Sequence, residues 1–132
     1  MKYLTEHRDE RGSFTEIFRT ILDNIVQVNL SISRPGIVRA WHRHQHQNDY
    51  ICVIQGKAKI CVFDGVNIKE IFVSGAKKQV IYVPRNTWHG TKNIGKKNSL
   101  TLYGQTSQYN PKYPDEERLE QIYIEKGKIY EW

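Results

Sequence analysis

The densest group of chemically active side chains is the histidine-rich run between Trp41 and Asp49. Three of the five histidines of the chain, His42, His44 and His46, lie in this run at intervals of two residues. Because side chains on a regular β-strand alternate between its two faces, the spacing predicts that the three imidazoles share one face. Imidazoles gathered in this way are not typical of an apolar core, so we expect them at a functional site or on the surface.

Two kinds of chemistry suit this run of histidines. Neutral imidazole is a common ligand of divalent metals, and Asp49 adds a carboxylate at the end of the run. Imidazole is also the side chain best matched to general-base catalysis near neutral pH. The residues leave both possibilities open.

The segments that must position these side chains read as strands. Apolar and β-branched residues recur in short stretches bounded by turn signals such as Pro35-Gly36 and Asp64-Gly65. The predicted strands cover residues 26–32, 37–41, 50–54, 58–63, 67–73, 79–83, 88–93 and 99–103. Residues 15–24 are the only stretch that could turn into a helix, and residues 121–132 could add an edge strand. Many short strands with even spacing predict an all-β sandwich or barrel.

Composition narrows the class of protein further. A length of 132 residues predicts one domain over residues 1–132, and 39% hydrophobic with 26% charged residues is typical of a globular protein. No apolar run approaches the roughly 18 residues of a membrane span, and the N-terminus has no secretory hydrophobic region. We therefore expect a cytoplasmic location and no membrane partner. Cys52 and Cys61 lie in alternating apolar stretches and are expected to be small buried hydrophobes.

The positive charge of the chain is spread rather than concentrated. The net charge of +6 comes largely from scattered lysines, without a known nucleic-acid-binding motif. We expect no nucleic-acid partner, whereas a small anionic ligand is compatible with this charge.

Two spacing patterns resemble the motifs of the cupin fold. Gly36, His42, His44, Asp49 and Gly56 are separated by five, one, four and six residues, as in the first cupin motif, which normally has Glu at the position of Asp49. Pro84, His89 and Asn93 follow the second motif, with Asn86 where glycine is usual. The resemblance implies a double-stranded β-helix, or jelly-roll barrel. In a metal-dependent cupin, it would make His42, His44, Asp49 and His89 the ligands.

A closer resemblance covers roughly residues 9 to 118. Its blocks, in order, are Asp9-Glu10-Arg11-Gly12-Ser13-Phe14, Val26-Gln27-Val28-Asn29, Gly36-Ile37-Val38-Arg39-Ala40-Trp41-His42, Val83-Pro84 with Trp88-His89-Gly90, and Tyr103 before Tyr109-Asn110-Pro111. Together they resemble dTDP-4-dehydrorhamnose 3,5-epimerase and its relatives.

This resemblance implies catalysis without a metal or redox cofactor on a nucleotide-sugar substrate. His42 would remove a proton from a carbon beside the keto group of the sugar, and Tyr103 would return a proton from the opposite face. Arg39 and Arg11 would hold the nucleotide diphosphate, Arg11 reaching into the neighbouring subunit of a homodimer. The remaining predicted substrate-binding residues are Glu16, Gln27, Asn29, His44, Asp49 and His89.

The chain also departs from the pattern of that family. The active-site lysine of the family aligns with Asp49, and its late aspartate, which partners the catalytic histidine, does not align. Asp115 and Glu116 are the nearest carboxylates. The His42-Arg43-His44 pattern also resembles the sugar 3,4-ketoisomerases. A keto shift, a metal-dependent cupin reaction and a non-catalytic sugar-binding barrel therefore remain alternatives to epimerisation.

Overall fold

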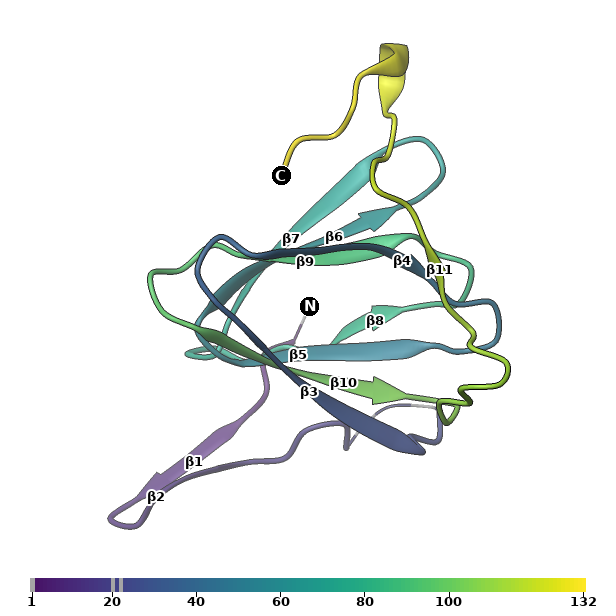
Figure 1. Cartoon of the computed structure of the whole chain (residues 1–132). Helices are drawn as coiled ribbons and strands as arrows, with labels where there is room; N and C mark the ends of the chain where they lie inside the picture. The colour runs from purple at the N-terminus through teal and green to yellow at the C-terminus, as the bar shows by residue number, and fades with distance from the viewer. Residues whose placement is uncertain (1, 20, 22) are drawn as a thin grey trace.

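Two antiparallel β-sheets face each other in the computed structural model, which describes residues 2–19, 21 and 23–132 (Figure 1). One sheet has the strand order β3-β10-β5-β8, and the other has the order β11-β4-β9-β6-β7. The strands of the first sheet are β3 (Gln27–Ser33), β10 (Ser99–Gln105), β5 (Asp49–Gln55) and β8 (Ile81–Val83). Those of the second are β11 (Glu117–Arg118), β4 (Val38–Arg43), β9 (His89–Asn93), β6 (Lys57–Phe63) and β7 (Ile68–Ser74). The predicted all-β jelly-roll barrel and its eight strands are confirmed.

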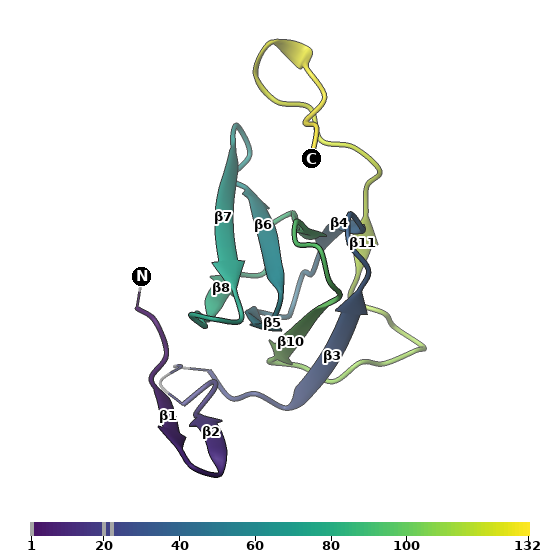
Figure 2. The ribbon, with the colours of Figure 1, turned by 90° about the vertical axis from the view of Figure 1, so that its left-hand side faces the viewer.

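The ends of the chain differ from the prediction. A hairpin of β1 (Glu6–Asp9) and β2 (Gly12–Thr15), for which the sequence predicted no strands, projects away from the barrel (Figure 2). The described residues of 15–24 contain no helix, and residues 121–132 form no edge strand. Instead, the tail contains the short 3-10 helix η1 (Glu125–Gly127) and an isolated bridge between Tyr123 and Ile129. Within the described part of the chain, no helix is long and apolar enough to cross a membrane.

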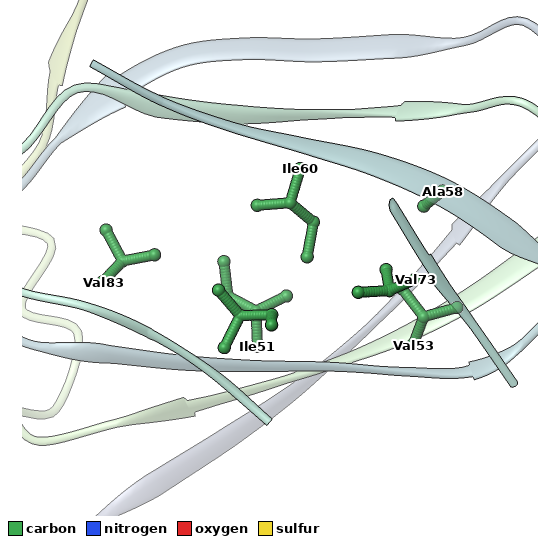
Figure 3. Packing of buried hydrophobic residues seen from close by; sticks show 7 residues of the cluster. Ile51, Val53, Ala58, Ile60, Val73 and Val83 are labelled. Carbon is green, nitrogen blue, oxygen red and sulfur yellow. The ribbon is translucent and has the colours of Figure 1, made fainter. Parts of the chain in front are cut away.

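The main core fills the space between the two sheets (Figure 3). Ile51 and Val53 extend from β5 toward Ala58 and Ile60 on β6, and all four side chains are at most 2% exposed. The alternation that brings Ile51 and Val53 inward also turns Asp49, two residues earlier, to the same face. The core therefore fixes the direction of a residue of the histidine-rich region.

A second core lies on the outer side of the five-stranded sheet, under the C-terminal segment. Trp41 is 1% exposed and packs against Trp132 and Tyr130, with ring centroids 4.9 and 5.9 Å apart. Cys61 is also fully buried here, whereas Cys52 is buried in the other sheet, so both cysteines are small buried residues as predicted. Packing of Trp41 on the outside leaves its neighbour His42 to point toward the interior of the barrel.

Candidate functional site

The predicted histidines meet where β4, β5 and β9 come together. Register in the five-stranded sheet places His42 of β4 opposite His89 of β9, and their ring centroids are 6.0 Å apart. His44 follows directly after β4, and its ring lies 5.9 Å from that of His89. Asp49 begins β5 and is 3% exposed. The two spacing patterns therefore converge on one place in the fold.

His46 does not join this group, and the prediction that three histidines share one face is wrong for it. Regular strand β4 ends at Arg43, and His46 is exposed. The carboxylate of Asp115 accepts hydrogen bonds from the backbone N–H groups of Gln45 and His46, at 2.8 and 2.9 Å. These bonds hold the chain in a turn, so the alternation of the strand does not continue to His46.

Asp49 is the centre of the site. Its Oδ2 lies 3.4 Å from Nε2 of His44 and 3.5 Å from Nε2 of His89. Its Oδ1 accepts a hydrogen bond of 2.6 Å from Nε2 of Gln47. Burial opposes ionisation, but the contacts with His44 and His89 outweigh it and hold the pKa of Asp49 well below its usual value. Asp49 is thus a buried carboxylate anion.

Both ring nitrogens of His44 and of His89 are engaged. Nδ1 of His44 lies 2.6 Å from the backbone oxygen of Asp115, and Nδ1 of His89 lies 2.9 Å from that of Thr87. A carbonyl oxygen only accepts, so each Nδ1 is the donor. Burial would lower the pKa of His44, but Asp49 outweighs this effect and raises it. Contacts within the protein thus occupy both nitrogens of each ring.

His42 has a different environment. Its Nδ1 is buried without an aligned hydrogen bond and lies 3.4 Å from Oε1 of Glu116. Its side chain keeps 24% of its surface exposed. Burial and the nearby His89 lower the pKa of His42, against the opposing charge of Glu116. A neutral imidazole on a partly exposed side chain is the form that can accept a proton.

Tyr103 reaches the same interior from β10. It lies opposite Ile51 of β5 and Asn29 of β3 in the sheet register and packs against the main core. Burial raises the pKa of its hydroxyl, while the Thr91 side chain and the charge of Arg39 act in the other direction. Tyr103 is therefore protonated at neutral pH and can serve as a proton donor.

A cavity of about 330 Å³ opens beside this cluster. Of the predicted site residues, Gln27, Asn29 and His44 line it. Gln27 also organises its wall, because its Nε2 donates to Oδ1 of Asn29 at 3.0 Å and its Oε1 accepts from the backbone N–H of Tyr109 at 2.9 Å. Sequence reasoning missed much of the lining, namely Gln47, Gln105, Gln108, Tyr109, Asn110 and Tyr113. The only signal for this part was the Tyr109-Asn110-Pro111 block.

Seven of the predicted residues are not part of the cavity lining, namely His42, Tyr103, Asp49, His89, Arg39, Glu16 and Arg11. Arg39 donates to Oγ of Ser33 at 2.8 Å and to the backbone oxygen of Ile32 at 3.0 Å. Glu16 pairs with Arg19 at 2.9 Å. Arg11 is 84% exposed on the projecting hairpin, where it pairs with Asp9. Within a single chain the structure does not bring Arg11 or Glu16 to the histidines.

The residues that could hold a metal are His44, Asp49 and His89. One ligand atom from each lies within 4.8 Å of the others. Two imidazoles and a carboxylate suit a divalent transition metal. His42 is not part of this group, so three of the four ligands expected for a metal-dependent cupin come together among the described residues.

Comparison with known protein families shows the family to which the chain belongs. Residues 7–117 match the model of the polysaccharide biosynthesis C-terminal domain. The chain belongs to this family. The chain is also similar to the probable low-salt glycan biosynthesis epimerase Agl13 of Haloferax volcanii, to which it is 34% identical over 88% of this chain and 82% of the length of Agl13.

Two solved structures of longer proteins are similar to this chain. The capsular polysaccharide assembling protein CapF of Staphylococcus aureus is 34% identical with a TM-score of 0.70 over 89% of this chain. The chain spans only 34% of the length of CapF. The rmlC epimerase of Mycobacterium tuberculosis is 27% identical with a TM-score of 0.74 over 89% of this chain and 66% of its own. Agl13 and the rmlC epimerase confirm the sequence-based assignment to the carbohydrate epimerases, an isomerase class.

Proposed function

We propose that this chain epimerises a nucleotide-linked 4-keto-6-deoxyhexose, with a dTDP sugar as the substrate, at C3, C5 or both. The observation that carries the proposal is the contrast among the three histidines. His44 and His89 have both ring nitrogens in contact with protein groups, whereas His42 combines a partly exposed side chain, a lowered pKa and a carboxylate near Nδ1. His42 is therefore the histidine suited to act as a general base.

The reaction follows from the acidity of a carbon beside a carbonyl group. Nε2 of His42 takes the proton, and the electron pair of the C–H bond moves onto the keto oxygen to give an enolate. The hydroxyl of Tyr103 then delivers a proton to the opposite face of the carbon, which inverts its configuration. Glu116 stabilises the imidazolium that forms on His42, since the two side chains are 3.4 Å apart.

The amide-rich cavity is the proposed place for the sugar. Gln27 and Asn29 bring donors and acceptors that suit hydroxyl groups. Asp49 and His89, which lie behind its wall, and His44, which forms part of it, keep the cavity polar. Arg39 is proposed to hold the diphosphate, because guanidinium groups suit phosphate oxygens.

Arg11 joins this site only in a dimer. The hairpin that carries it projects from the barrel (Figure 2). The side chain of Arg11 is 84% exposed. On the outer face of β3, Val28, Leu30 and Ile32 are 53–55% exposed. An apolar strand face of this kind favours contact with a second copy. We propose a homodimer in which the hairpin of one subunit brings Arg11, and with it Glu16, to the site of the other.

Proton exchange tests the proposed function. A dTDP-4-keto-6-deoxyhexose is incubated with the protein in deuterated water and followed by NMR. Deuterium at C3 or C5 that depends on His42 supports epimerisation, and movement of the keto group to C3 would identify a 3,4-ketoisomerase instead. His42→Asn should retain substrate binding while exchange falls by at least about a hundredfold. Exchange at the wild-type rate in this variant contradicts the role of His42.

A metal-dependent reaction is the second candidate, favoured by the convergence of His44, Asp49 and His89. These three would hold the ion, which would supply Lewis-acid polarisation of the keto oxygen. Metal analysis of the purified protein and of His89→Ala distinguishes the two candidates. Stoichiometric metal that is lost in His89→Ala, together with exchange that depends on added ion, favours the metal-dependent enzyme.

A further inference from the structure

Gln47 is a buried polar residue to which the mechanism above gives no role. It is 6% exposed and stands two residues before Asp49. Its Nε2 donates to Oδ1 of Asp49 at 2.6 Å, and its Oε1 accepts from Oγ of Ser107 at 3.3 Å. A carboxylate only accepts hydrogen bonds, so the amide must turn its nitrogen toward Asp49 and its oxygen toward Ser107. Both ends of the amide are therefore committed.

Because of this contact, the two oxygens of the Asp49 carboxylate have different partners. Oδ1 is taken by Gln47, whereas Oδ2 faces Nε2 of both His44 and His89, at 3.4 and 3.5 Å. Rotation of the carboxylate about its terminal bond would move Oδ2 away from both rings. Asp49 is 3% exposed, so solvent could not easily replace the lost contacts.

The neighbouring side chain of Asn48 forms its hydrogen bonds with other partners. Asn48, between Gln47 and Asp49, donates from Nδ2 to Asp23 at 3.3 Å and accepts from the backbone N–H of Arg85 at 2.9 Å. Within the part of the chain that the structure describes, Gln47 is the side-chain donor that reaches Oδ1 of Asp49. The position of Oδ1 is therefore fixed by this amide.

We propose that Gln47 is a positioning residue that fixes the carboxylate of Asp49, so that a single oxygen serves both His44 and His89. Gln47 also lines the cavity, and Ser107 belongs to the segment that follows β10. The amide thus connects the wall of the cavity to the charged cluster behind it. Any effect of this positioning on turnover rests on the proposed function, whereas the positioning of the Asp49 carboxylate does not.

The test compares nitrogen-resolved imidazole NMR signals of the wild type and Gln47→Met at one fixed pH. Methionine keeps the length of the side chain but has no N–H to donate. The signals of His44 and His89 should shift, while that of His7, on the projecting hairpin, stays in place. Gln79→Met is the matched control, since Gln79 is another buried glutamine and lines a different cavity. It should leave the signals of His44 and His89 unchanged.

A second variant, with a smaller change than Gln47→Met, keeps the test valid if Gln47→Met does not fold. Ser107→Ala removes only the hydroxyl that holds Oε1 of Gln47, and should shift the same two signals in the same direction by less. Unchanged signals of His44 and His89 in folded Gln47→Met, or equal shifts in Gln79→Met, would overturn the proposal. No sugar is needed for these spectra. Absence of turnover on every sugar tested would therefore count against the proposed function and leave the positioning role standing.

Discussion

Oε1 of Glu116 lies 3.4 Å from Nδ1 of His42, beside the point where β11 pairs with β4. The other oxygen of this carboxylate accepts hydrogen bonds from Nε and Nη2 of Arg118, at 3.1 and 2.9 Å. Arg118 thereby holds one oxygen and leaves the other facing the imidazole. The sequence left the carboxylate partner of His42 unassigned, with Asp115 and Glu116 as the nearest carboxylates, and Glu116 is the one that lies beside His42.

We expect Glu116→Gln to lower kcat about 10- to 100-fold, because the imidazolium formed on His42 loses its counter-charge. The variant should also shift the pH dependence. The charge of Glu116 raises the pKa of His42, so its removal lowers that pKa further. Activity requires neutral His42, and the acidic limb of the plot of kcat against pH should therefore move to lower pH.

Glu117→Gln is the control for this substitution. Glu117 pairs with Arg43 at 2.8 Å and adjoins Glu116 in the chain, but it does not contact His42. Its loss should leave the acidic limb in place. An acidic limb that stays unchanged in Glu116→Gln would assign the base to another residue.

The parts of the fold that sequence predicted are those governed by local rules. The predicted strand over residues 50–54 is confirmed by β5, which begins one residue earlier and places Asp49 on the same face as Ile51. Asn86 stands where the second cupin motif has glycine and has a φ of 62°. Asparagine is among the residues that tolerate this left-handed conformation, so the departure preserves the turn.

The parts that escaped prediction depend on contacts between distant segments. Pairing of β11 with β4 places Glu116 beside His42, and only two residues form that strand, too few for a pattern. The turn at His46 depends on the Asp115 carboxylate, which comes from the same distant segment. The β1–β2 hairpin is exposed on most of its residues and therefore lacks the apolar alternation that marks a half-buried strand.

Acid should destabilise the wild-type protein through Asp49. The pKa of this residue is lowered in the folded state, so its contribution to stability is complete above the unfolded pKa of about 3.9 and is lost as pH falls further. Urea titrations between about pH 5 and pH 2 should show the free energy of unfolding falling in this window. Asp49→Asn should be less stable at pH 7 and show a flatter dependence. An equally steep fall in the variant would assign the effect to other carboxyl groups.

The packing between the sheets predicts a large effect for Ile60→Ala. Ile60 is 0% exposed and lies in the centre of the main core (Figure 3). Loss of its buried atoms and the cavity left behind should lower the free energy of unfolding by about 2–5 kcal/mol in urea titrations. Val66→Ala, at a side chain that is 65% exposed, should change it by less than about 0.5 kcal/mol. Similar values for the two variants would contradict this description of the core.

The proposed dimer places Leu30 at the contact between subunits. Leu30 is 55% exposed between Val28 and Ile32 on the same face of β3. Leu30→Asp should convert the dimer to a monomer in light scattering, because an unpaired charge would be buried in an apolar contact. Val66→Asp provides a matched charge on an exposed apolar residue elsewhere and should leave the mass unchanged. A wild-type protein that is monomeric at all concentrations would rule out the shared role of Arg11.

The C-terminal segment should protect the thiol of Cys61, but not that of Cys52, from alkylation. Trp132 lies against Trp41, and Nζ of Lys59 lies 5.4 Å from the centre of the Trp132 ring. Cys61 is buried in the same cluster, 3.3 Å from the hydroxyl of Tyr130. Trp132→Ala should loosen this cover, and the rate of Cys61 alkylation should rise about tenfold or more.

Cys52 is an internal control in the same molecule. It is also 0% exposed, but it belongs to the opposite sheet, and burial raises the pKa of its thiol to about 11. Alkylation followed by peptide mass spectrometry distinguishes the two sites. A selective gain at Cys61 would show that the segment opens locally, because global unfolding exposes both thiols together. Equal gains at both cysteines would instead mean that Trp132 stabilises the whole barrel, and that the tail does not open as a separate unit.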